Sequence, residues 1–248
     1  MKKLVLQLIF GFIILPGALA GTLYYLNKNG FFNISKIEVV LENPTPGQEQ
    51  FLKPKVDELE EGLKKYKGLS LWNIKLKKIS KEISANNWVD GLNIKRSWPS
   101  TLQVRLRPHE VKLLFLTKTG KLVPIIKDGS FLNPVDAKQA PDVALLEGEA
   151  FVKKSALRKK AVDVIEQIPA EGSFSKKTIS EIRHDTKEGF WMTLIKSGIQ
   201  VKMGEDQVAL KAARVSQVVD YLDSRQFDAR VIDANLSKKV LVRLRKDP

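Results

Sequence analysis

The sequence predicts an α+β protein: an N-terminal transmembrane helix, a domain with the order β-α-α-β-β, and a mixed α/β domain dominated by an antiparallel sheet. Three observations support this prediction. A long uncharged run opens the 248-residue chain. Alternating strand patterns recur after it, and segments with apolar residues at helical spacing separate them. Hydrophobic residues make up 43% of the chain, which is enough for a substantial core.

The uncharged run covers residues 4–26 and follows a stub at residues 1–3. As a helix it would be about 34 Å long, enough to cross a hydrocarbon core of about 30 Å. Residues 16–21 (PGALAG) also fit the A-x-A pattern that signal peptidase cleaves. The length of the run favours a retained anchor, and a cleaved signal peptide remains the alternative. Either would export residues 27–248.

The composition limits the chemistry and the partners. The chain has no Cys, which excludes disulfides, thiol catalysis and thiolate zinc sites. The formal net charge of +14 would suit nucleic acid, an anionic membrane surface or an acidic protein. Export makes nucleic acid an unsuitable partner. We therefore interpret the charge as a solvated surface beside anionic lipid headgroups.

The segment after the anchor predicts a compact α+β domain. Strands are expected at 34–40, 88–95 and 102–107, and the last of these alternates strictly between apolar and polar residues. Helices are expected at 56–66 and 76–83, where apolar residues recur at i, i+3 and i+7. Two such helices can cover one face of a three-stranded sheet.

The rest of the chain predicts short strands and two further helices. The helices are expected at 157–168 and 215–222. The strands are expected at 120–124, 179–182, 190–195, 199–203, 231–233 and 240–245. The four tryptophans lie in or beside these elements, and we expect them in the core: Trp72, Trp88, Trp98 and Trp191.

The order of these elements resembles the FtsQ/DivIB family of bacterial cell-division proteins, which are bitopic and carry a POTRA domain next to the membrane. The segments that carry the resemblance are GLSLW (68–72), NWV (87–89), RSWPSTL (96–102) and PDVALLEG (141–148). The resemblance implies a POTRA domain at 27–109 and an FtsQ-type β domain at 110–248. It also implies a single-pass protein of the inner membrane, largely periplasmic, at the division septum.

In this family the final strands of the second domain bind FtsB (DivIC in some lineages), which travels with FtsL. The resemblance therefore implies a partner-binding strand formed by Lys239, Val240, Leu241, Val242, Arg243, Leu244 and Arg245. We expect its apolar face at 240, 242 and 244. An edge strand has unpaired N–H and C=O groups that can receive a strand from another chain.

The positive charge around this strand has two interpretations. It would complement acidic residues of a partner. It would equally protect an exposed edge from aggregation, and the residues alone favour neither. The charged residues concerned are Lys238, Lys239, Arg243, Arg245 and Lys246.

No catalytic residue, cofactor, metal site or small-molecule substrate is predicted. His184 precedes Asp185, but adjacent residues of a strand point to opposite faces. The chain has no nucleophile elbow, zinc-protease or phosphate-loop motif. The sequence thus predicts a scaffold that acts by binding. An exported POTRA module of a secretion or outer-membrane assembly system is the alternative, and a wall-active enzyme with two carboxylates is a third class.

Overall fold

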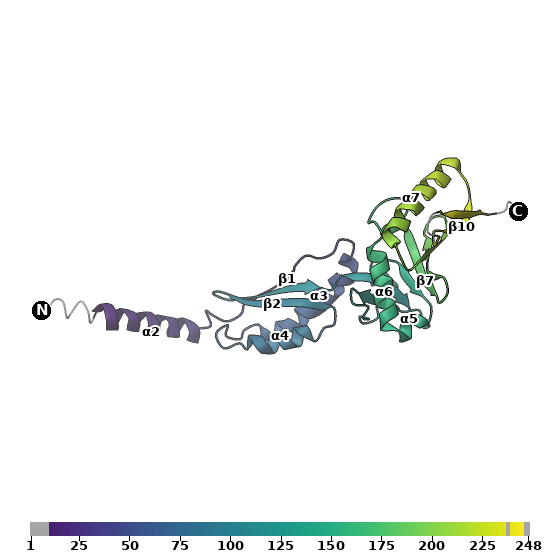
Figure 1. Ribbon diagram of the computed structural model, residues 1–248. Helices are drawn as coiled ribbons and strands as arrows, with labels where there is room; N and C mark the ends of the chain where they lie inside the picture. The colour runs from purple at the N-terminus through teal and green to yellow at the C-terminus, as the bar shows by residue number, and fades with distance from the viewer. Residues whose placement is uncertain (1–9, 237–238, 246–248) are drawn as a thin grey trace. The chain divides into compact units, whose positions relative to one another are not determined.

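The computed structural model describes residues 10–236 and 239–245 and divides into two compact units (Figure 1). The first unit holds the chain up to residue 44 together with residues 52–108. The second unit holds residues 45–51 and the chain from residue 109 onward. Within the second unit, the buried Gln48 side chain donates to the carbonyl oxygen of Val111 at 2.9 Å and accepts from its N–H at 3.2 Å.

The described part of the N-terminal run is helical. A π-helical turn, Phe10–Ile14, leads into α2, Leu15–Lys28. Pro16 lies at the start of α2, directly after this π-helical turn. Within the described residues, no helix is both long and apolar enough to cross a membrane. Residues 4–9 of the expected span lie outside the described part of the chain.

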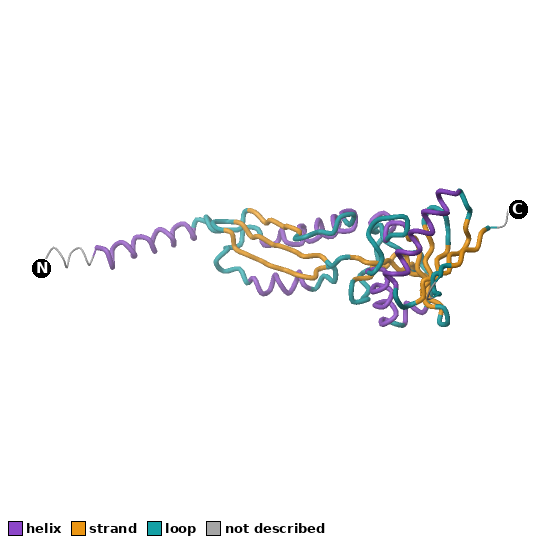
Figure 2. The backbone as a smooth tube through the Cα atoms, turned by 45° about the horizontal axis from the view of Figure 1, so that its top comes forward, coloured by secondary structure: helices purple, strands orange, loops and turns teal. Residues whose placement is uncertain are grey.

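After α2, the first unit contains a three-stranded sheet and two α-helices, in the order β-α-α-β-β that the sequence predicts (Figure 2). Its central strand β3 pairs in parallel with β1 and antiparallel with β2. The elements are β1 (Lys36–Leu41), α3 (Glu49–Leu63), α4 (Leu76–Ser84), β2 (Val89–Ser97) and β3 (Thr101–Pro108), with a short 3₁₀ helix, Lys64–Tyr66, after α3.

Strict alternation in β3 builds the core of the first unit. Leu102, Val104 and Leu106 are fully buried on one face of the strand. Ile79 and Ile83, one turn apart on α4, are fully buried as well. The periodic patterns of these two segments therefore mark the surfaces that the unit removes from water.

The expectation that all four tryptophans lie in the core is confirmed for Trp88 alone, because Trp191 is only partly buried and the other two are exposed. Trp88 is 5% exposed, but Trp72 is 53% and Trp98 is 48% exposed. Trp72 and Trp98 both lie in turns, outside the helices and strands, at one end of the first unit. A turn imposes no inward or outward periodicity, so the pattern around these residues could not place their rings.

Tyr66 and Glu82 connect the 3₁₀ helix to α4. The Tyr66 hydroxyl donates to the Glu82 carboxylate at 2.7 Å, and Lys65 donates to the same carboxylate. Burial, reinforced by the bond to Glu82, raises the pKa of Tyr66 to about 12. The hydrogen bonds from Lys65 and Tyr66 hold the pKa of Glu82 below its usual range.

The second unit is built on an eight-stranded sheet in the order β11-β10-β9-β8-β7-β6-β4-β5. The pairs β4–β6, β6–β7 and β9–β10 are parallel, and the other pairs are antiparallel. The strands are β4 (Val111–Leu116), β5 (Leu122–Ile126), β6 (Leu145–Glu147), β7 (Ile179–Asp185), β8 (Gly189–Leu194), β9 (Gln200–Gly204), β10 (Ala229–Asp233) and β11 (Leu241–Leu244).

Helices pack on this sheet and complete the core of the second unit (Figure 1). They are α5 (Ala150–Lys153), α6 (Ser155–Glu166) and α7 (Val208–Arg225), with 3₁₀ turns at Ala137–Gln139 and Lys176–Thr178. Val215 and Val219 of α7 join the same hydrophobic cluster as Val201 and Met203 of β9 and Ile232 of β10. The apolar face of α7 thereby fixes the strands nearest the C-terminal edge of the sheet.

We expect Glu82→Gln to destabilise the first unit in a pH-dependent way. Because the pKa of Glu82 is lower in the folded chain than in the unfolded chain, its ionised form stabilises the fold above the unfolded pKa. This stabilisation is lost as the pH falls through the folded pKa. The Tm difference between wild type and Glu82→Gln should be positive at neutral pH and shrink below about pH 4.

Glu61→Gln is the control for this titration, because Glu61 is 71% exposed and its ion pair with Lys64 lies within one helical turn. The Tm difference between wild type and Glu61→Gln should stay small across the whole pH range. Thermal unfolding followed by circular dichroism across the pH range measures both variants. A Glu82→Gln difference that does not change with pH would contradict the role assigned to the carboxylate.

Candidate partner-binding edge

β11 is the outermost strand at one end of the eight-stranded sheet. It pairs antiparallel with β10, with Leu241 opposite Asp233 and Val242 opposite Ile232. Within the described residues, no strand pairs with the other edge of β11. The residues expected to bind a partner therefore occupy a sheet edge whose outward backbone groups face away from the sheet.

The side chains of this strand divide into supporting and exposed residues. Val240 and Val242 are partly buried against the core of the second unit. Leu241 is 49% and Leu244 is 52% exposed. Leu244, which continues the apolar alternation of Val240 and Val242, lies at the end of the strand and is exposed. Its partner is Ala229, which lies beyond a register shift in β10 between Ala229 and Val231.

The basic residues of the edge differ in how they are held. Lys239, Arg243 and Arg245 are exposed. Arg245 is fixed by its neighbours: its N–H donates to the Asp228 carbonyl at 2.9 Å, and its guanidinium donates to the Ser197 carbonyl at 3.1 Å. Lys238 and Lys246, also expected in the basic rim, lie outside the described residues.

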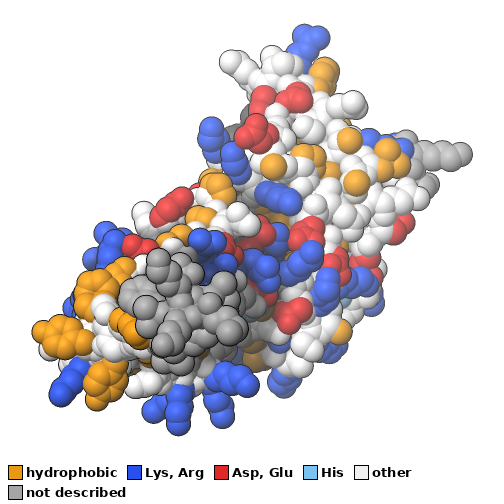
Figure 3. Space-filling view, turned by 90° about the vertical axis from the view of Figure 1, so that its left-hand side faces the viewer, with side chains coloured by type: hydrophobic (Ala, Val, Ile, Leu, Met, Phe, Trp, Pro, Cys, Tyr) orange, Lys and Arg blue, Asp and Glu red, His pale blue; other side chains and the backbone are white. Residues whose placement is uncertain are grey.

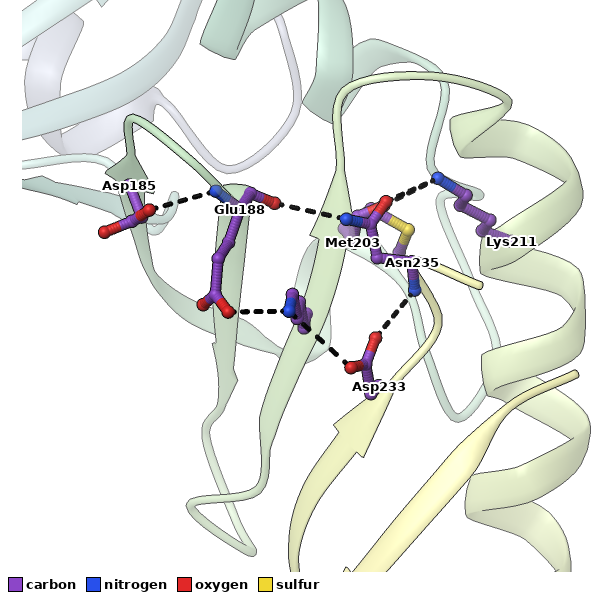
Figure 4. Close-up of polar contacts among 7 residues, drawn as sticks. Asp185, Glu188, Met203, Lys211, Asp233 and Asn235 are labelled. Atoms are coloured by element: carbon purple, nitrogen blue, oxygen red, sulfur yellow. Dashed lines mark hydrogen bonds and ion pairs between the residues drawn. The ribbon is translucent and has the colours of Figure 1, made fainter. Parts of the chain in front are cut away.

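A buried lysine organises the start of the turn that leads to β11 (Figure 4). Lys211 of α7 is only 3% exposed. Its Nζ donates to the Met203 carbonyl at 3.1 Å, to Asp206 Oδ1 at 2.6 Å and to Asn235 Oδ1 at 3.1 Å. One ammonium group thus joins the end of β9, the start of α7 and the segment just after β10.

Asn235 is held from further directions as well. Its N–H donates to Asp233 Oδ1 at 3.0 Å, and its side-chain amide donates to the Glu188 carbonyl at 3.5 Å. Lys202 lies between the two acidic side chains, donating to Glu188 Oε1 at 2.7 Å and pairing with Asp233 at 3.7 Å. The hydrogen bond that Lys202 donates to Glu188 is the chief cause of the raised pKa of Lys202, which keeps this lysine charged. These contacts fix where the chain leaves β10.

Gly204 makes the close approach of Asn235 possible. Its φ of +74° lies in the left-handed region, which favours glycine. A Cβ at this position would lie 2.0 Å from Asn235 Oδ1 and 2.7 Å from its Cγ. Residue 204 therefore has to be glycine for the backbone conformation and also for space.

The histidine that precedes Asp185 does not pair with it. His184 Nε2 lies 2.8 Å from Glu205 Oε1, and Lys160 binds the same carboxylate. Asp185 instead accepts the N–H groups of the following turn, from Lys187 at 2.7 Å and Glu188 at 2.9 Å. Lys160 and His184 hold the pKa of Glu205 below its usual range, which is unfavourable for a general base near pH 7.

No metal-binding cluster of three or more His, Cys, Asp or Glu residues occurs in the described part of the chain. On the face shown in Figure 3, Lys and Arg side chains lie among Asp and Glu side chains.

The sequence did not predict the Lys211 network, although it contains one signal. Lys211 lies on the buried face of α7, beside Ala212 and between Val208 and Val215. A lysine at such a position needs acceptors, because an unpaired buried charge is strongly unfavourable. Neither the spacing nor the composition identifies those acceptors. They lie up to 24 residues away from the lysine along the chain.

Comparison with protein families agrees with the two-unit architecture. Residues 54–108 match the POTRA domain, FtsQ-type, and residues 115–235 match the C-terminal domain of cell division protein FtsQ/DivIB. The chain is therefore a POTRA-containing cell-division protein. It belongs to the FtsQ/DivIB family. The second match ends at Asn235, so β11 lies beyond it.

Individual relatives carry the same name at low identity. The chain is 23% identical over 185 residues to cell division protein FtsQ of Syntrophotalea carbinolica, covering 71% of this chain and 64% of that protein. It is 22% identical over 184 residues to cell division protein FtsQ of Geotalea daltonii, covering 71% and 66%. The chain thus spans slightly less than two thirds of the length of these relatives.

We expect Lys211→Met to destabilise the second unit by about 2–3 kcal/mol. The variant keeps the alkyl stem but removes the donor to the Met203 carbonyl and Asn235, and hydrogen bonds to charged groups contribute about 1.5–3 kcal/mol. Chemical denaturation measures the free energy of unfolding. Lys196→Met, at an exposed lysine, should change it by less than about 0.5 kcal/mol. Equal losses in both variants would contradict the network.

We expect Gly204→Ala to destabilise the chain more than Gly120→Ala. The two glycines have similar φ values, +74° and +78°, so both variants carry the left-handed strain of about 1–2 kcal/mol. Nothing lies within 4 Å of a Cβ at Gly120, whereas Asn235 blocks a Cβ at Gly204. The difference between the two unfolding free energies therefore measures the displacement of Asn235. Equal destabilisation would show that Asn235 moves away without loss.

Proposed function

We propose that this protein is a bitopic, membrane-anchored scaffold of the division septum that recruits FtsB/FtsL-type partners by strand addition to β11. The observation that carries the proposal is the outer edge of β11, which no other strand of the described residues covers. Membership in a family of cell-division proteins supports the process in which this edge acts.

Strand addition would use the backbone and the side chains of β11 differently. The outward N–H and C=O groups would provide the hydrogen bonds that hold an added strand, irrespective of its sequence. Leu241 and Leu244 would supply exposed apolar surface for the partner's side chains. Lys239 and Arg243 would favour a partner segment with acidic residues and increase the rate of encounter.

The edge is suited to binding because it is supported from behind. Val240 and Val242 pack against the core, and Arg245 is bonded to Asp228 and Ser197. A strand held in this way loses little conformational freedom when a partner binds, and such preorganisation raises affinity. The same basic residues protect an unpaired edge from non-specific pairing, so the two interpretations of the charge are compatible.

The membrane part of the proposal rests on residues 4–26, which carry no charge. The described portion of this run exposes large apolar side chains, among them Phe12, Leu15 and Leu19. Such side chains are favourable in lipid and unfavourable in water. In this proposal the run is a retained anchor in the inner membrane, and residues 27–248 act in the periplasm by binding and not by catalysis.

The matches to both FtsQ-type models favour cell division over a secretion or outer-membrane assembly system. The partners and the site are the parts of the proposal that need a direct test. The test below therefore changes side chains that β11 exposes and leaves its supporting valines intact.

We expect the double variant Leu241→Lys, Leu244→Lys to bind an FtsB/FtsL-type complex from the same organism about tenfold or more weakly than wild type. Both side chains are about half exposed, so the loss should come from the interface and not from the core. Titration of the purified full chain with the complex, followed by isothermal calorimetry, measures the affinity.

Leu210→Lys is the matched control, since Leu210 is also 49% exposed but lies on α7. It should bind with wild-type affinity. Thermal unfolding of all three proteins should agree within a few degrees. If the β11 variant binds with wild-type affinity, the assignment of the site to β11 is wrong. If the wild-type chain does not bind the complex at all, the proposed partners are wrong.

A further inference from the structure

Four aromatic rings form a contiguous cluster at one end of the first unit. Phe32 is its centre, with ring centroids 5.2 Å from Phe31, 5.8 Å from Trp72 and 5.7 Å from Trp98. The two indole rings contact each other at 4.6 Å. We call these four residues the aromatic cluster. They come from three separate segments, so the cluster depends on the folded unit.

The cluster is exposed at its rim and buried at its centre. Phe32 is 8% exposed, whereas Phe31, Trp72 and Trp98 are each close to half exposed. Leu69 beside them is 50% exposed. Contiguous apolar surface of this kind is rare on proteins that stay entirely in water, and it typically marks a contact with a membrane or a partner.

The backbone holds the cluster rigidly in the first unit. Residues 32–34 pair with residues 68–71 through the bonds Ile34 N–H to Leu69 O, Gly68 N–H to Ile34 O and Leu71 N–H to Phe32 O, each 2.9 Å long. The Arg96 guanidinium also donates to the carbonyls of Leu71 and Ile74, at 2.7 and 2.9 Å. Trp72 lies between these two carbonyls in the chain and is therefore fixed from both sides.

The cluster is connected directly to the end of α2. Gly30, with φ of +77°, ends the helix in a Schellman motif: its N–H donates to Asn27 O at 3.1 Å, and the Phe31 N–H donates to Leu26 O at 3.0 Å. Ser70 Oγ reaches Asn27 Oδ1 at 3.4 Å. The helix end and the cluster therefore form one continuous piece of structure.

We propose that the aromatic cluster inserts into the headgroup region of an anionic membrane, next to the point where the anchor enters it. This inference rests on the membrane anchor of the proposed function. Trp and Tyr are enriched at this depth because their rings are apolar and their N–H and O–H groups remain hydrated. Tyr24 and Tyr25, in the last turns of α2, are 70% and 67% exposed and precede Phe31 by only a few residues in the chain.

The charges near the cluster favour lipid as the occupant. Lys28 follows the tyrosines, and Lys67 and Lys75 flank the turn that carries Trp72, all three exposed. Aromatic rings bordered by lysines suit the interface of an anionic leaflet, where ring and ammonium contribute together.

The test uses the full chain reconstituted into vesicles of phosphatidylcholine and phosphatidylglycerol, with and without acyl chains brominated close to the headgroup. Bromine quenches tryptophan fluorescence at short range. We expect the brominated lipid to quench the wild-type chain, and Trp72→Phe, Trp98→Phe to abolish that quenching. Trp191→Phe is the control, because Trp191 lies on β8 of the second unit, and it should leave the quenching unchanged.

Flotation of the vesicles separates this inference from the proposed anchor. A chain that floats with the vesicles but shows no quenching overturns membrane insertion of the cluster and leaves the anchor standing. Quenching that persists in the double variant also overturns it. If quenching is absent in vesicles and Trp72 and Trp98 are shielded from acrylamide in native membranes, the occupant is a membrane protein and not lipid. A chain that does not float overturns the anchor, and the inference with it.

Discussion

The C-terminal part of the second unit depends on the placement of one ammonium group in a nearly water-free position. Lys211 is held there by a backbone carbonyl and two side-chain oxygens, and in return it joins β9, α7 and the exit from β10. A charge in such a position has no comparable alternative to its partners, since water cannot replace them. The geometry of its acceptors is therefore strongly constrained, and so is the point where the chain leaves β10.

The two candidate contact surfaces differ in how they are made rigid. At β11, hydrophobic support from Val240 and Val242 and the bonds of Arg245 hold a strand whose outer edge is available. In the aromatic cluster, backbone hydrogen bonds between distant segments hold three rings that are about half exposed. In both places the backbone is already held by contacts within the folded chain, so the exposed groups need no further ordering when a partner binds. Such surfaces bind with a small entropic penalty.

Local periodicity predicted those elements of the fold that have one buried face. β3 and α4 are examples, because their buried residues recur every second residue or once per turn. β4 was missed for the opposite reason: Leu113, Leu114 and Phe115 are consecutive and all buried, so no alternation marks the strand. In the sheet β4 lies between β6 and the edge strand β5. Its three consecutive buried residues show that both of its faces are covered.

The position of the candidate edge strand was predictable, but its details were not. The apolar alternation includes Val240 and Val242, which pack against the core, and Leu244, which is exposed. The register shift opposite Leu244 belongs to the partner strand β10 and leaves no mark in the sequence of β11. The acceptors of Lys211 likewise come from other segments.

The hydrogen bonds between Gln48 and Val111 have a further consequence, for modularity. The side chain of Gln48, far upstream in the chain, bonds both backbone groups of Val111 as a neighbouring strand would. Any exchange of this domain between relatives would have to carry two pieces of chain, or leave the first residue of β4 without its hydrogen-bond partner.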